Sequence, residues 1–502
     1  MPRSLLSDDD SASHRRLADA DAVLARWSAD WPQGHSDARI LEEYLVGRAA
    51  GDLDVSGRPV GDAGAAAGEV AALDREVAHD RTAQATDAAV STAVLDDPDG
   101  SLTLVAALTG AHATAGSHAT AVATDSASAV HACRRAVEAL PDAVRSTVGF
   151  HDTAAEAVAA LAHEPTRLRV VVHASKHIAV LREQLRLVET LAAEVVVVGR
   201  EKHMSPSLNR LLAESYERVD VSPGRAKSRL LIATGPKKSQ SVASASTAAH
   251  PAAISRPRVP VQNAAPSPAP GVPEILVSAF PGAFGGASAD PGSRILVDAL
   301  ARRLPGLAPA SGDGRTGPSA RVRVLDLGSG NGWLLAAVGS LLPHASLFGV
   351  DDSRAAVEST VLTAASVRAG EEPAVVLHAD ATGRLPWQAD DDGDRTASAD
   401  GEDSEDPAAF AEGSFDLVTL NPPFHDGTSM TTDIAHDLID AAAALLRPGG
   451  RLIVVYNSHL RYRSHLQHRF SDVEQWARDR RFTVVSGTKP GSARGETRTP
   501  TS

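Results

Sequence analysis

The sequence predicts an α/β protein made of two similar sheet domains in tandem. In both halves of the 502-residue chain, short β-branched or apolar runs alternate with segments of helix length. That alternation is typical of parallel strands joined by crossover helices. A stretch rich in Pro, Ala and Ser separates the halves, and neither helical nor strand periodicity continues through it. We therefore expect one domain at 1–235, a linker at 236–273, a second domain at 274–490 and a disordered tail at 491–502.

The predicted elements follow one another in the same manner in each half. In the first half we expect strands at 102–108, 120–123, 170–172 and 195–198, with helices at 127–140 and 178–191. In the second half we expect strands at 322–327, 347–350, 374–377, 417–420 and 452–456, with a helix at 333–342. Segments 124–130 and 351–357 align without gaps, each between the end of a strand and the start of a helix, which favours a weak internal repeat.

Composition excludes several classes of protein. The chain has 43% hydrophobic and 22% charged residues, which is typical of a globular protein rather than a disordered or collagen-like one. Its one cysteine, Cys133, can neither form an internal disulfide nor anchor a thiolate metal site, so we expect a reducing compartment and no bound metal. No stretch approaches the ~20 apolar residues of a membrane span. A cytoplasmic protein is the resulting expectation.

Charge is distributed unevenly along the chain, whose formal net charge is −14. Residues 167–238 have 14 basic and 7 acidic side chains, a net charge of +7, whereas residues 389–414 have ten acidic side chains and one arginine. A polyanion can bind a local basic region of an acidic protein, because charges are screened over short distances. Solvated protein surface is the alternative interpretation of the same pattern.

A glycine-rich turn follows the predicted strand at 322–327. The strand contains Asp326 and continues into Gly328-Ser329-Gly330-Asn331-Gly332, after which a helix is expected. Glycine permits positive φ and close approach of a ligand to the backbone, and the free N–H groups at a helix start favour negative charge. The turn therefore predicts a site for a nucleotide-like ligand.

Two further aspartates follow the next strands of the second half. Asp351 ends the second strand, where a carboxylate can accept hydrogen bonds from both hydroxyls of a ribose, and Asp380 follows the third, where it can meet an adenine edge or be an ordinary loop residue. No Gly-Lys-Ser or Gly-Lys-Thr follows the glycine turn, which excludes a P-loop. The Asp-x-Gly-x-Gly-x-Gly form resembles the first motif of class I S-adenosylmethionine-dependent methyltransferases, and a dinucleotide site is the alternative.

The fourth strand of the second half leads into Asn421-Pro422-Pro423-Phe424. The two prolines fix φ and remove donors, so the backbone after Asn421 is held extended. An exocyclic amine on an aromatic base is a poor nucleophile, because its lone pair is delocalised into the ring. If the Asn421 side-chain oxygen and the Pro422 carbonyl each accept one of its hydrogens, the lone pair turns toward an incoming methyl group, while Phe424 stacks on the base.

These residues resemble those of a known family, the ribosomal RNA guanine-N2 methyltransferases of the RsmC and RlmG group. The resemblance rests on Asp326–Gly332, on Asp351 and above all on Asn421-Pro422-Pro423-Phe424-His425-Asp426-Gly427. It extends upstream to Phe284 and the Asp290-x-Gly292 pair. Asn457-Ser458-His459-Leu460 is closer to the large-subunit members, which slightly favours the large subunit.

The resemblance implies two tandem Rossmann-like methyltransferase domains, the first degenerate and the second catalytic. It implies that S-adenosylmethionine is held by Asp326, Gly328, Gly330, Gly332, Asp351 and Asp380. It further implies that a flipped guanine of ribosomal RNA, free or within a ribosomal subunit, is held by Asn421, Pro422, Pro423 and Phe424.

The first half departs from the catalytic pattern. Thr124 stands where the second half has Asp351, His173-Ala174-Ser175 stands where it has Asn421-Pro422-Pro423, and Thr109-Gly110-Ala111 is no glycine-rich loop. We therefore expect the first domain to bind no cofactor. The family likeness implies a scaffold that recognises RNA, with candidate contacts at Lys176, Lys202, Arg225, Lys227 and Arg229.

Two other functions share part of this pattern. An amino methyltransferase acting on protein glutamine or DNA adenine uses the same Asn/Asp-Pro-Pro-aromatic logic. Phenylalanine rather than tyrosine at 424, and the absence of a DNA target-recognition domain, weigh against it. A non-catalytic RNA-binding assembly factor is the second alternative, and the intact Asp326, Asp351 and Asn421 weigh against it.

Overall fold

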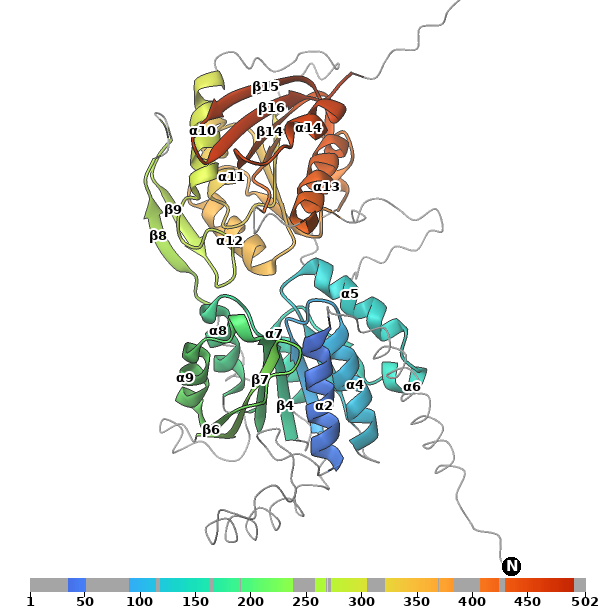
Figure 1. Ribbon diagram of the computed structural model, residues 1–502. Coiled ribbons are helices and arrows are strands. Elements are labelled where there is room, and N and C mark those ends of the chain that lie inside the picture. The colour runs from blue at the N-terminus through green and yellow to red at the C-terminus, as the bar shows by residue number, and fades with distance from the viewer. Residues whose placement is uncertain are drawn as a thin grey trace, which may run out of the picture. The chain divides into compact units, whose positions relative to one another are not determined.

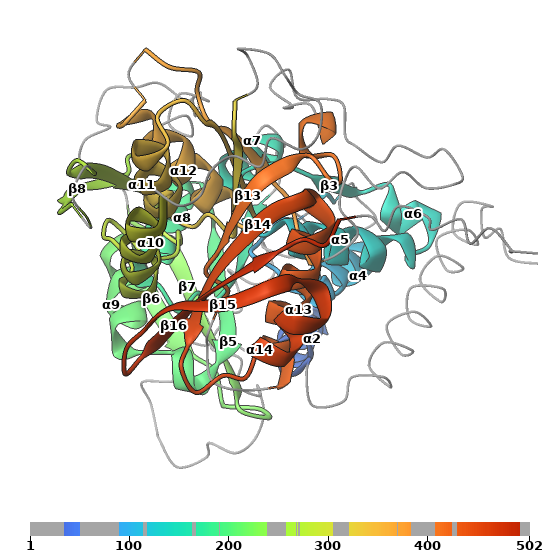
Figure 2. The ribbon, with the colours of Figure 1, turned by 90° about the horizontal axis from the view of Figure 1, so that it is seen from above.

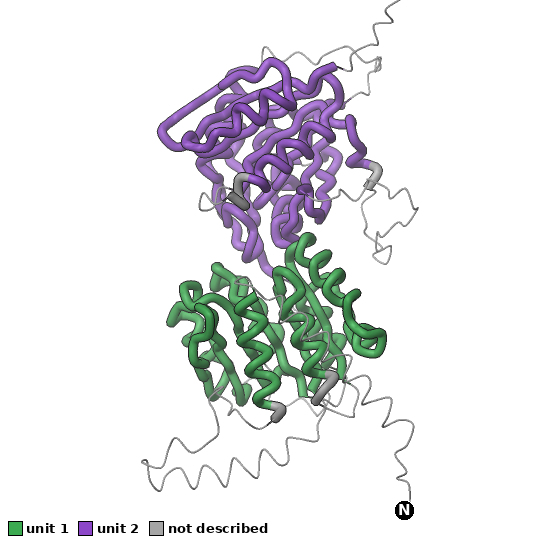
Figure 3. Tube along the Cα trace, turned by 45° about the vertical axis from the view of Figure 1, so that its right-hand side comes forward, with its two compact units in different colours: residues 1–257 green, residues 258–502 purple. Residues whose placement is uncertain are grey.

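The computed structural model divides into two compact units, residues 1–257 and 258–502 (Figure 3). It describes residues 35–50, 90–113, 118–162, 167–189, 191–237, 258–267, 269, 272–304, 321–368, 370–382, 407–423 and 429–491. Phe424, residues 389–406 of the acidic segment and the predicted tail beyond residue 491 lie outside these ranges.

The first unit is an α/β fold on a seven-stranded sheet of order β3-β2-β1-β4-β5-β7-β6 (Figure 1). Its strands are β1 (Val90–Leu95), β2 (Thr120–Ala123), β3 (Val148–Phe150), β4 (Arg167–His173), β5 (Glu194–Arg200), β6 (Tyr216–Val221) and β7 (Ser228–Pro236). Its helices are α2 (Ser36–Ala50), α4 (Ser101–Ala113), α5 (Ala127–Glu138), α6 (Asp142–Arg145), α7 (Ala154–Leu161), α8 (Ile178–Val188) and α9 (Pro206–Ser215).

The second unit has a seven-stranded sheet of order β12-β11-β10-β13-β14-β16-β15 (Figure 2). Its strands are β10 (Arg323–Leu327), β11 (Ser346–Asp351), β12 (Val375–His378), β13 (Phe415–Leu420), β14 (Leu446–Asn457), β15 (Ser471–Arg478) and β16 (Phe482–Thr488). Its helices are α10 (Pro291–Arg303), α11 (Trp333–Leu341), α12 (Arg354–Ala365), α13 (Ser429–Leu445) and α14 (Arg463–Arg469), and β8 (Val261–Ala265) pairs with β9 (Ile275–Ala279).

The two sheets have the same strand order, and their registers match. Leu95 at the end of β1 pairs with Val172 of β4, as Leu327 at the end of β10 pairs with Leu420 of β13. The serines of the aligned segments also match, because Ser126 caps α5 and Ser353 caps α12 through the same side-chain hydrogen bond. The tandem Rossmann-like architecture predicted from the sequence is confirmed.

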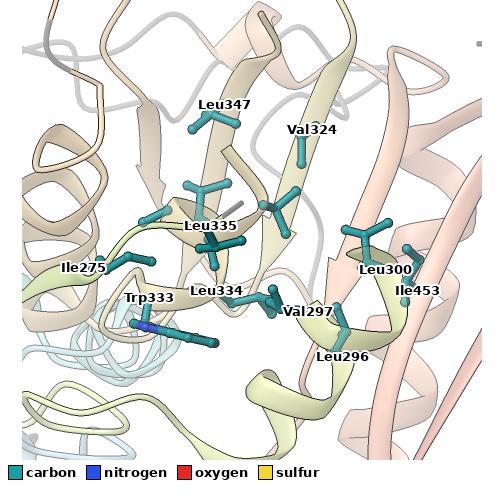
Figure 4. Packing of buried hydrophobic residues seen from close by; sticks show 14 of the residues in the cluster. Ile275, Leu296, Val297, Leu300, Val324, Trp333, Leu334, Leu335, Leu347 and Ile453 are labelled. Carbon is teal, nitrogen blue, oxygen red and sulfur yellow. The ribbon is translucent and has the colours of Figure 1, made fainter. Parts of the chain in front are cut away.

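The central strand β10 is buried on both faces, so its side chains point alternately toward the two faces of the sheet. Val324 packs in the cluster formed with α10 and α11 (Figure 4), whereas Leu325 and Leu327 pack in the cluster on the other face of the sheet. Because side chains alternate along a strand, Asp326 lies on the Val324 face, beneath α10 and α11. The same alternation on β13 puts Leu417 and Thr419 on that face.

Two expectations for the elements differ from the structure. Residues 102–108, predicted as a strand, lie in the buried helix α4, and the first strand is β1, which has polar residues at Ser91 and Thr92. A short apolar run has no periodicity that separates a buried helix from a buried strand. The range predicted as a linker, 236–273, contains β8. Among the described residues, no helix is long and apolar enough to cross a membrane.

We expect Gly332→Ala to destabilise the second unit more than Gly449→Ala. Both glycines have positive φ, 76° and 78°, so a side chain costs about 1–2 kcal/mol at either position. A Cβ at Gly332 would lie 2.5 Å from the backbone Cα of Thr360, whereas nothing lies within 4 Å at Gly449. Crowding should add about 1–3 kcal/mol. Urea denaturation followed by circular dichroism measures both, and equal losses would contradict the packing argument.

Candidate active site

A pocket opens on the second unit where β10 and β13 end. Strands β11 and β12 continue the sheet on one side of β10, and β13 and β14 continue it on the other, so the pocket lies at the point where the strand order reverses. In open α/β sheets this is the place where ligands bind. The lining residues are Phe284, Asp290, Ser293, Asp326, Gly328, Ser329, Gly330, Asn331, Trp333, Leu334 and Asn421.

The glycine turn forms one wall of this pocket. Gly328, Gly330 and Gly332 all have positive φ, of 77°, 57° and 76°, which explains why glycine occupies these positions. The Asn331 amide donates to the carbonyls of Gly286 and Ser288 at 2.6 and 2.7 Å, so the turn is attached to the loop before α10.

Asp351 supports the glycine turn from beneath. Its Oδ2 accepts a hydrogen bond from the Gly330 N–H at 2.8 Å, and its Oδ1 accepts one from the Ser353 N–H at 2.9 Å. The contact of Asp351 with ribose hydroxyls stays a prediction.

Asp326 is a buried acid on the floor of the pocket. Its Oδ1 accepts from the Thr419 hydroxyl at 2.7 Å, whereas its buried Oδ2 has no hydrogen-bond partner among the described residues. The Leu335 N–H lies near the carboxylate without forming a standard hydrogen bond. Burial raises the pKa of Asp326 to about 7, Thr419 opposes this rise, and the charge of Asp351 adds to it. A cation bound beside Oδ2 would favour ionisation.

Asn421 follows β13 directly and lines the same pocket. Its Nδ2 donates to Asp290 Oδ2 at 2.9 Å and to Ser293 Oγ at 3.0 Å. Its Oδ1 is buried and has no hydrogen-bond partner among the described residues. A buried acceptor without a donor is costly, so this oxygen is suited to receive a donor from a ligand.

Of the described sequence-predicted residues after β12 and β13, Asp380, Pro422 and Pro423 are not among those that line the pocket. Asp380 accepts hydrogen bonds from the backbone N–H and hydroxyl of Thr382, at 2.8 and 2.6 Å, and so closes its own turn. Pro422 is buried and Pro423 is exposed. The stacking role of Phe424 stays a prediction, because that residue lies outside the described ranges.

Sequence reasoning gave no role in the site to Ser293, Thr419 or Trp333, and Asp290 entered only through the family resemblance. Asp290-Pro291-Gly292-Ser293 has the pattern of a helix N-terminus, an aspartate cap followed by proline at the first helical position. That pattern predicts a cap but no contact with Asn421. Thr419 is buried in β13 like any residue of a central strand, so its sequence context does not mark it as part of the site.

The first unit has the same turn with different chemistry. The registers make 96–100, rather than the predicted 109–111 within α4, the counterpart of the glycine turn. Gly100, with φ of 85°, corresponds to Gly332. Asp97, the counterpart of Ser329, accepts from the Gly100 N–H at 3.1 Å and from the Thr103 N–H and hydroxyl at 2.8 and 2.7 Å. The chain's own carboxylate thus occupies the N–H groups of this turn.

The fold and the pocket define the second unit as a class I methyltransferase domain. Residues 274–390 and 398–486 match the family described as Methyltransferase small domain, and residues 73–238 match the RLMG N-terminal domain. The chain belongs to the RlmG and RsmC family of methyltransferases, as its motifs predicted. S-adenosylmethionine is the cofactor of such a domain, and the glycine turn and Asp326 Oδ2, which has no hydrogen-bond partner within the described ranges, fit this cationic nucleoside.

Three similar proteins illustrate the relationship. The chain is 31% identical over 323 residues to the Ribosomal RNA large subunit methyltransferase G of Ectopseudomonas mendocina (strain ymp), covering 64% of this chain and 70% of the relative. It is 32% identical over 215 residues to the Ribosomal RNA small subunit methyltransferase C of Chromohalobacter salexigens, covering 43% and 52%. The solved T. thermophilus 16S rRNA N2 G1207 methyltransferase (RsmC), in complex with AdoMet and guanosine, shares the fold with a TM-score of 0.52 and 21% identity, over 80% of this chain and 88% of that one.

Binding of S-adenosylmethionine should release a proton below pH 7. A carboxyl with a raised pKa is protonated in the free protein at pH 6, and a bound cation that lowers this pKa expels the proton. Affinity should then rise with pH up to about 7 and level off above it. Calorimetry in two buffers of different ionisation enthalpy measures the release at pH 6. The control is Asp326→Asn, in which the release should vanish; an unchanged release in that variant would assign the proton to another group.

Proposed function

We propose that the protein transfers the methyl group of S-adenosylmethionine to the exocyclic N2 amine of a guanine in ribosomal RNA. The observation that supports this most directly is the Asn421 amide, which lines the pocket and whose buried Oδ1 has no hydrogen-bond partner in the described part of the chain. An amine hydrogen is the donor that such an oxygen lacks. Because its substrate is ribosomal RNA, we place the protein in the cytoplasm.

The chemistry requires positioning more than a strong base, because the nitrogen–carbon bond would form as the carbon–sulfur bond breaks, S-adenosylhomocysteine would leave as a neutral thioether, and the methylated nitrogen would lose its proton to solvent afterwards. When bound, the cofactor supplies an activated methyl group on a cationic sulfur. Asn421 Oδ1 accepts one amine hydrogen and so turns the nitrogen lone pair out of conjugation, with the Pro422 carbonyl as the second acceptor. Alignment of this kind can lower a barrier by roughly 7–11 kcal/mol. Among the described residues no group of His, Cys, Asp and Glu side chains could hold a metal ion.

The comparisons support ribosomal RNA as the substrate. The relatives are named as methyltransferases of the large and the small ribosomal subunit, and the solved relative is an N2 guanine enzyme complexed with guanosine. The match of residues 73–238 to the RLMG N-terminal domain favours the large subunit.

The first unit offers a basic edge for RNA. Lys176 follows β4, Lys202 follows β5, and Lys227 lies in the turn before β7, whose first residue Ser228 pairs with Arg200 at the end of β5. All three lysines are therefore at the edge that corresponds to the catalytic edge of the second unit. They are exposed and have no ion pair among the described residues.

The two predicted arginines in this region are already paired. Arg225 donates to both carboxylate oxygens of Glu43, at 2.9 and 3.1 Å, and Arg229 donates to Glu201 at 2.9 Å. A paired arginine contributes less net charge to a phosphate contact. The lysines are therefore the stronger candidates for RNA binding.

Asn421→Ala should abolish turnover while the affinity for S-adenosylmethionine stays within a few-fold. The variant removes the amine acceptor and leaves the glycine turn and Asp326 in place. The measurement maps N2-methylated guanines in ribosomal RNA from cells that lack the gene and express either the wild type or the variant. If cells without the gene retain every N2-methylguanine, the proposed function is wrong. If the variant loses cofactor binding, the role of Asn421 is wrong.

Replacing Lys176, Lys202 and Lys227 together with Gln should weaken RNA binding and reduce its salt dependence. Each lost phosphate contact should lower the slope of log affinity against log salt by about 0.7–0.9. Cofactor affinity should not change. A charge-matched control replaces Arg135, Arg167 and Arg210 with Gln in the same way, because these arginines are exposed elsewhere on the same unit. Filter binding of ribosomal RNA across a salt series compares the two triple variants, and equal slopes would exclude this edge as the RNA surface.

A further inference from the structure

We propose that Asp290 and Ser293, at the start of α10, are positioning residues that hold the Asn421 amide with its oxygen toward the substrate amine. This inference rests on the proposed function, because it concerns how the same amide receives an amine. It assigns α10 a part in selecting what the enzyme methylates.

The chemistry of the partners decides which way the amide faces. An ionised carboxylate only accepts hydrogen bonds, so Asp290 Oδ2, at 2.9 Å, must face the NH2 group of Asn421 and not its oxygen. Ser293 Oγ, at 3.0 Å, meets the second hydrogen of the same NH2 group. Both amide donors are thereby used within the protein. The oxygen alone remains for a ligand, and it can only accept.

The carboxylate is itself held in place. Asp290 is the N-cap of α10, and its Oδ2 also accepts from the Ser293 N–H at 2.9 Å. At the next position but one, a Cβ on Gly292 would lie 3.0 Å from this oxygen and 3.3 Å from the Phe482 ring. The absence of a side chain at Gly292 therefore leaves room for Asp290 to reach Asn421. The start of a long helix fixes the angle of the amide.

The first unit repeats this pairing with other residues. His173 corresponds to Asn421 in the strand registers, and its Nε2 lies 3.4 Å from Asp37 Oδ2. Asp37 is in the first turn of α2, which packs on β5 and β7 as α10 packs on their counterparts β14 and β16. In both units, the carboxylate belongs to the start of the helix that precedes the first strand of the sheet. It contacts the last residue of β4 in the first unit and the first residue after β13 in the second. The first unit thus makes a comparable contact with an imidazole in place of the amide.

Without the Asp290 carboxylate, the Asn421 amide could flip, so that its oxygen and its NH2 group exchange positions. Ser293 could then donate its hydroxyl hydrogen to the Asn421 oxygen, because a hydroxyl is both a donor and an acceptor. The NH2 group would face the pocket and oppose the amine of the substrate, donor against donor. Catalysis should fall, whereas binding of the cofactor and of the RNA should not.

The first experiment separates capping from positioning. Asp290→Ser keeps a good N-cap for α10 but has a side chain too short to reach Asn421. We expect kcat on ribosomal RNA to fall about 10- to 100-fold, as expected for the loss of one hydrogen bond to a charged group, while KM for RNA and Kd for S-adenosylmethionine stay within about threefold. The conservative Asp290→Asn, which retains an acceptor of equal length, should keep most of the wild-type kcat. A loss that appears in Kd or KM alone would overturn the proposal.

The second experiment exchanges the two functional groups. Asn421→Asp alone sets two carboxylates against each other and should be nearly inactive. Adding Asp290→Asn restores a donor–acceptor pair with an oxygen facing the pocket, and we expect at least a tenfold recovery of kcat. A merely structural role for Asp290 predicts no recovery, so an inactive double variant whose circular dichroism and cofactor Kd match the wild type would overturn the proposal.

These measurements distinguish failure of the proposed function from failure of the positioning role of Asp290. Transfer of radioactive methyl to RNA from cells lacking the gene is assayed with the wild type first, and the modified nucleoside is identified. If the wild type methylates another amine, the guanine assignment fails and the variant ratios still test the positioning role on that amine. If the wild type makes N2-methylguanine and Asp290→Ser retains its kcat, only the positioning role fails.

Discussion

Strands β10 and β13 lie side by side and run in the same direction, with Leu327 opposite Leu420. Because of this register, the glycine turn after β10 and Asn421 after β13 begin at the same level of one sheet edge. The Thr419 hydroxyl adds a hydrogen bond of 2.7 Å across the two strands to Asp326. Without this pairing the glycine turn and the Asn421 amide, which are distant in sequence, would not share a pocket. The start of α10, which lies over the same face of the sheet, completes the pocket with Asp290 and Ser293.

The two units share one fold but have different chemistry at the same edge of the sheet. In the second unit the buried Asp326 lines the pocket beside the glycine turn, and its Oδ2 has no hydrogen-bond partner among the described residues. In the first, Asp97 hydrogen-bonds the turn internally and His173 replaces the amide. The scaffold is shared because strand order and register depend on buried apolar residues, whereas the edge is formed by polar residues that can change without loss of the core. We infer that the first unit serves RNA recognition and the second serves catalysis.

The chain is acidic overall, so binding of a polyanion requires a region in which positive charge is concentrated. Residues 1–166 contain 26 acidic and 12 basic side chains, whereas residues 167–238 contain 14 basic and 7 acidic ones, so the positive charge is concentrated in one segment of the sequence. Lys176 and Lys202 lie close enough to His203 that, after burial, their charges further lower its pKa. Screening over about 8–10 Å limits repulsion by distant carboxylates. A compact basic edge therefore suffices for a phosphate backbone.

Much of the second unit was predictable because its signals are local. A strand ending in a glycine turn, a carboxylate after the next strand and an Asn-Pro-Pro turn are each encoded within a few residues. The register of the repeat was also visible, since Ser126 and Ser353 cap equivalent helices. The helix α4 was mistaken for a strand because a fully buried run is apolar on every side and has no periodic pattern.

The sequence by itself determined the fold class, the glycine turn after β10 and the amide after β13, because backbone conformation and strand burial depend on neighbouring residues. Only the tertiary structure decided how these groups are tuned. The pKa of Asp326 depends on its burial, the support of Gly330 depends on Asp351, and the direction of the Asn421 amide depends on Asp290. Each of these effects arises between residues that are far apart in the chain and meet only when the sheet and α10 have assembled.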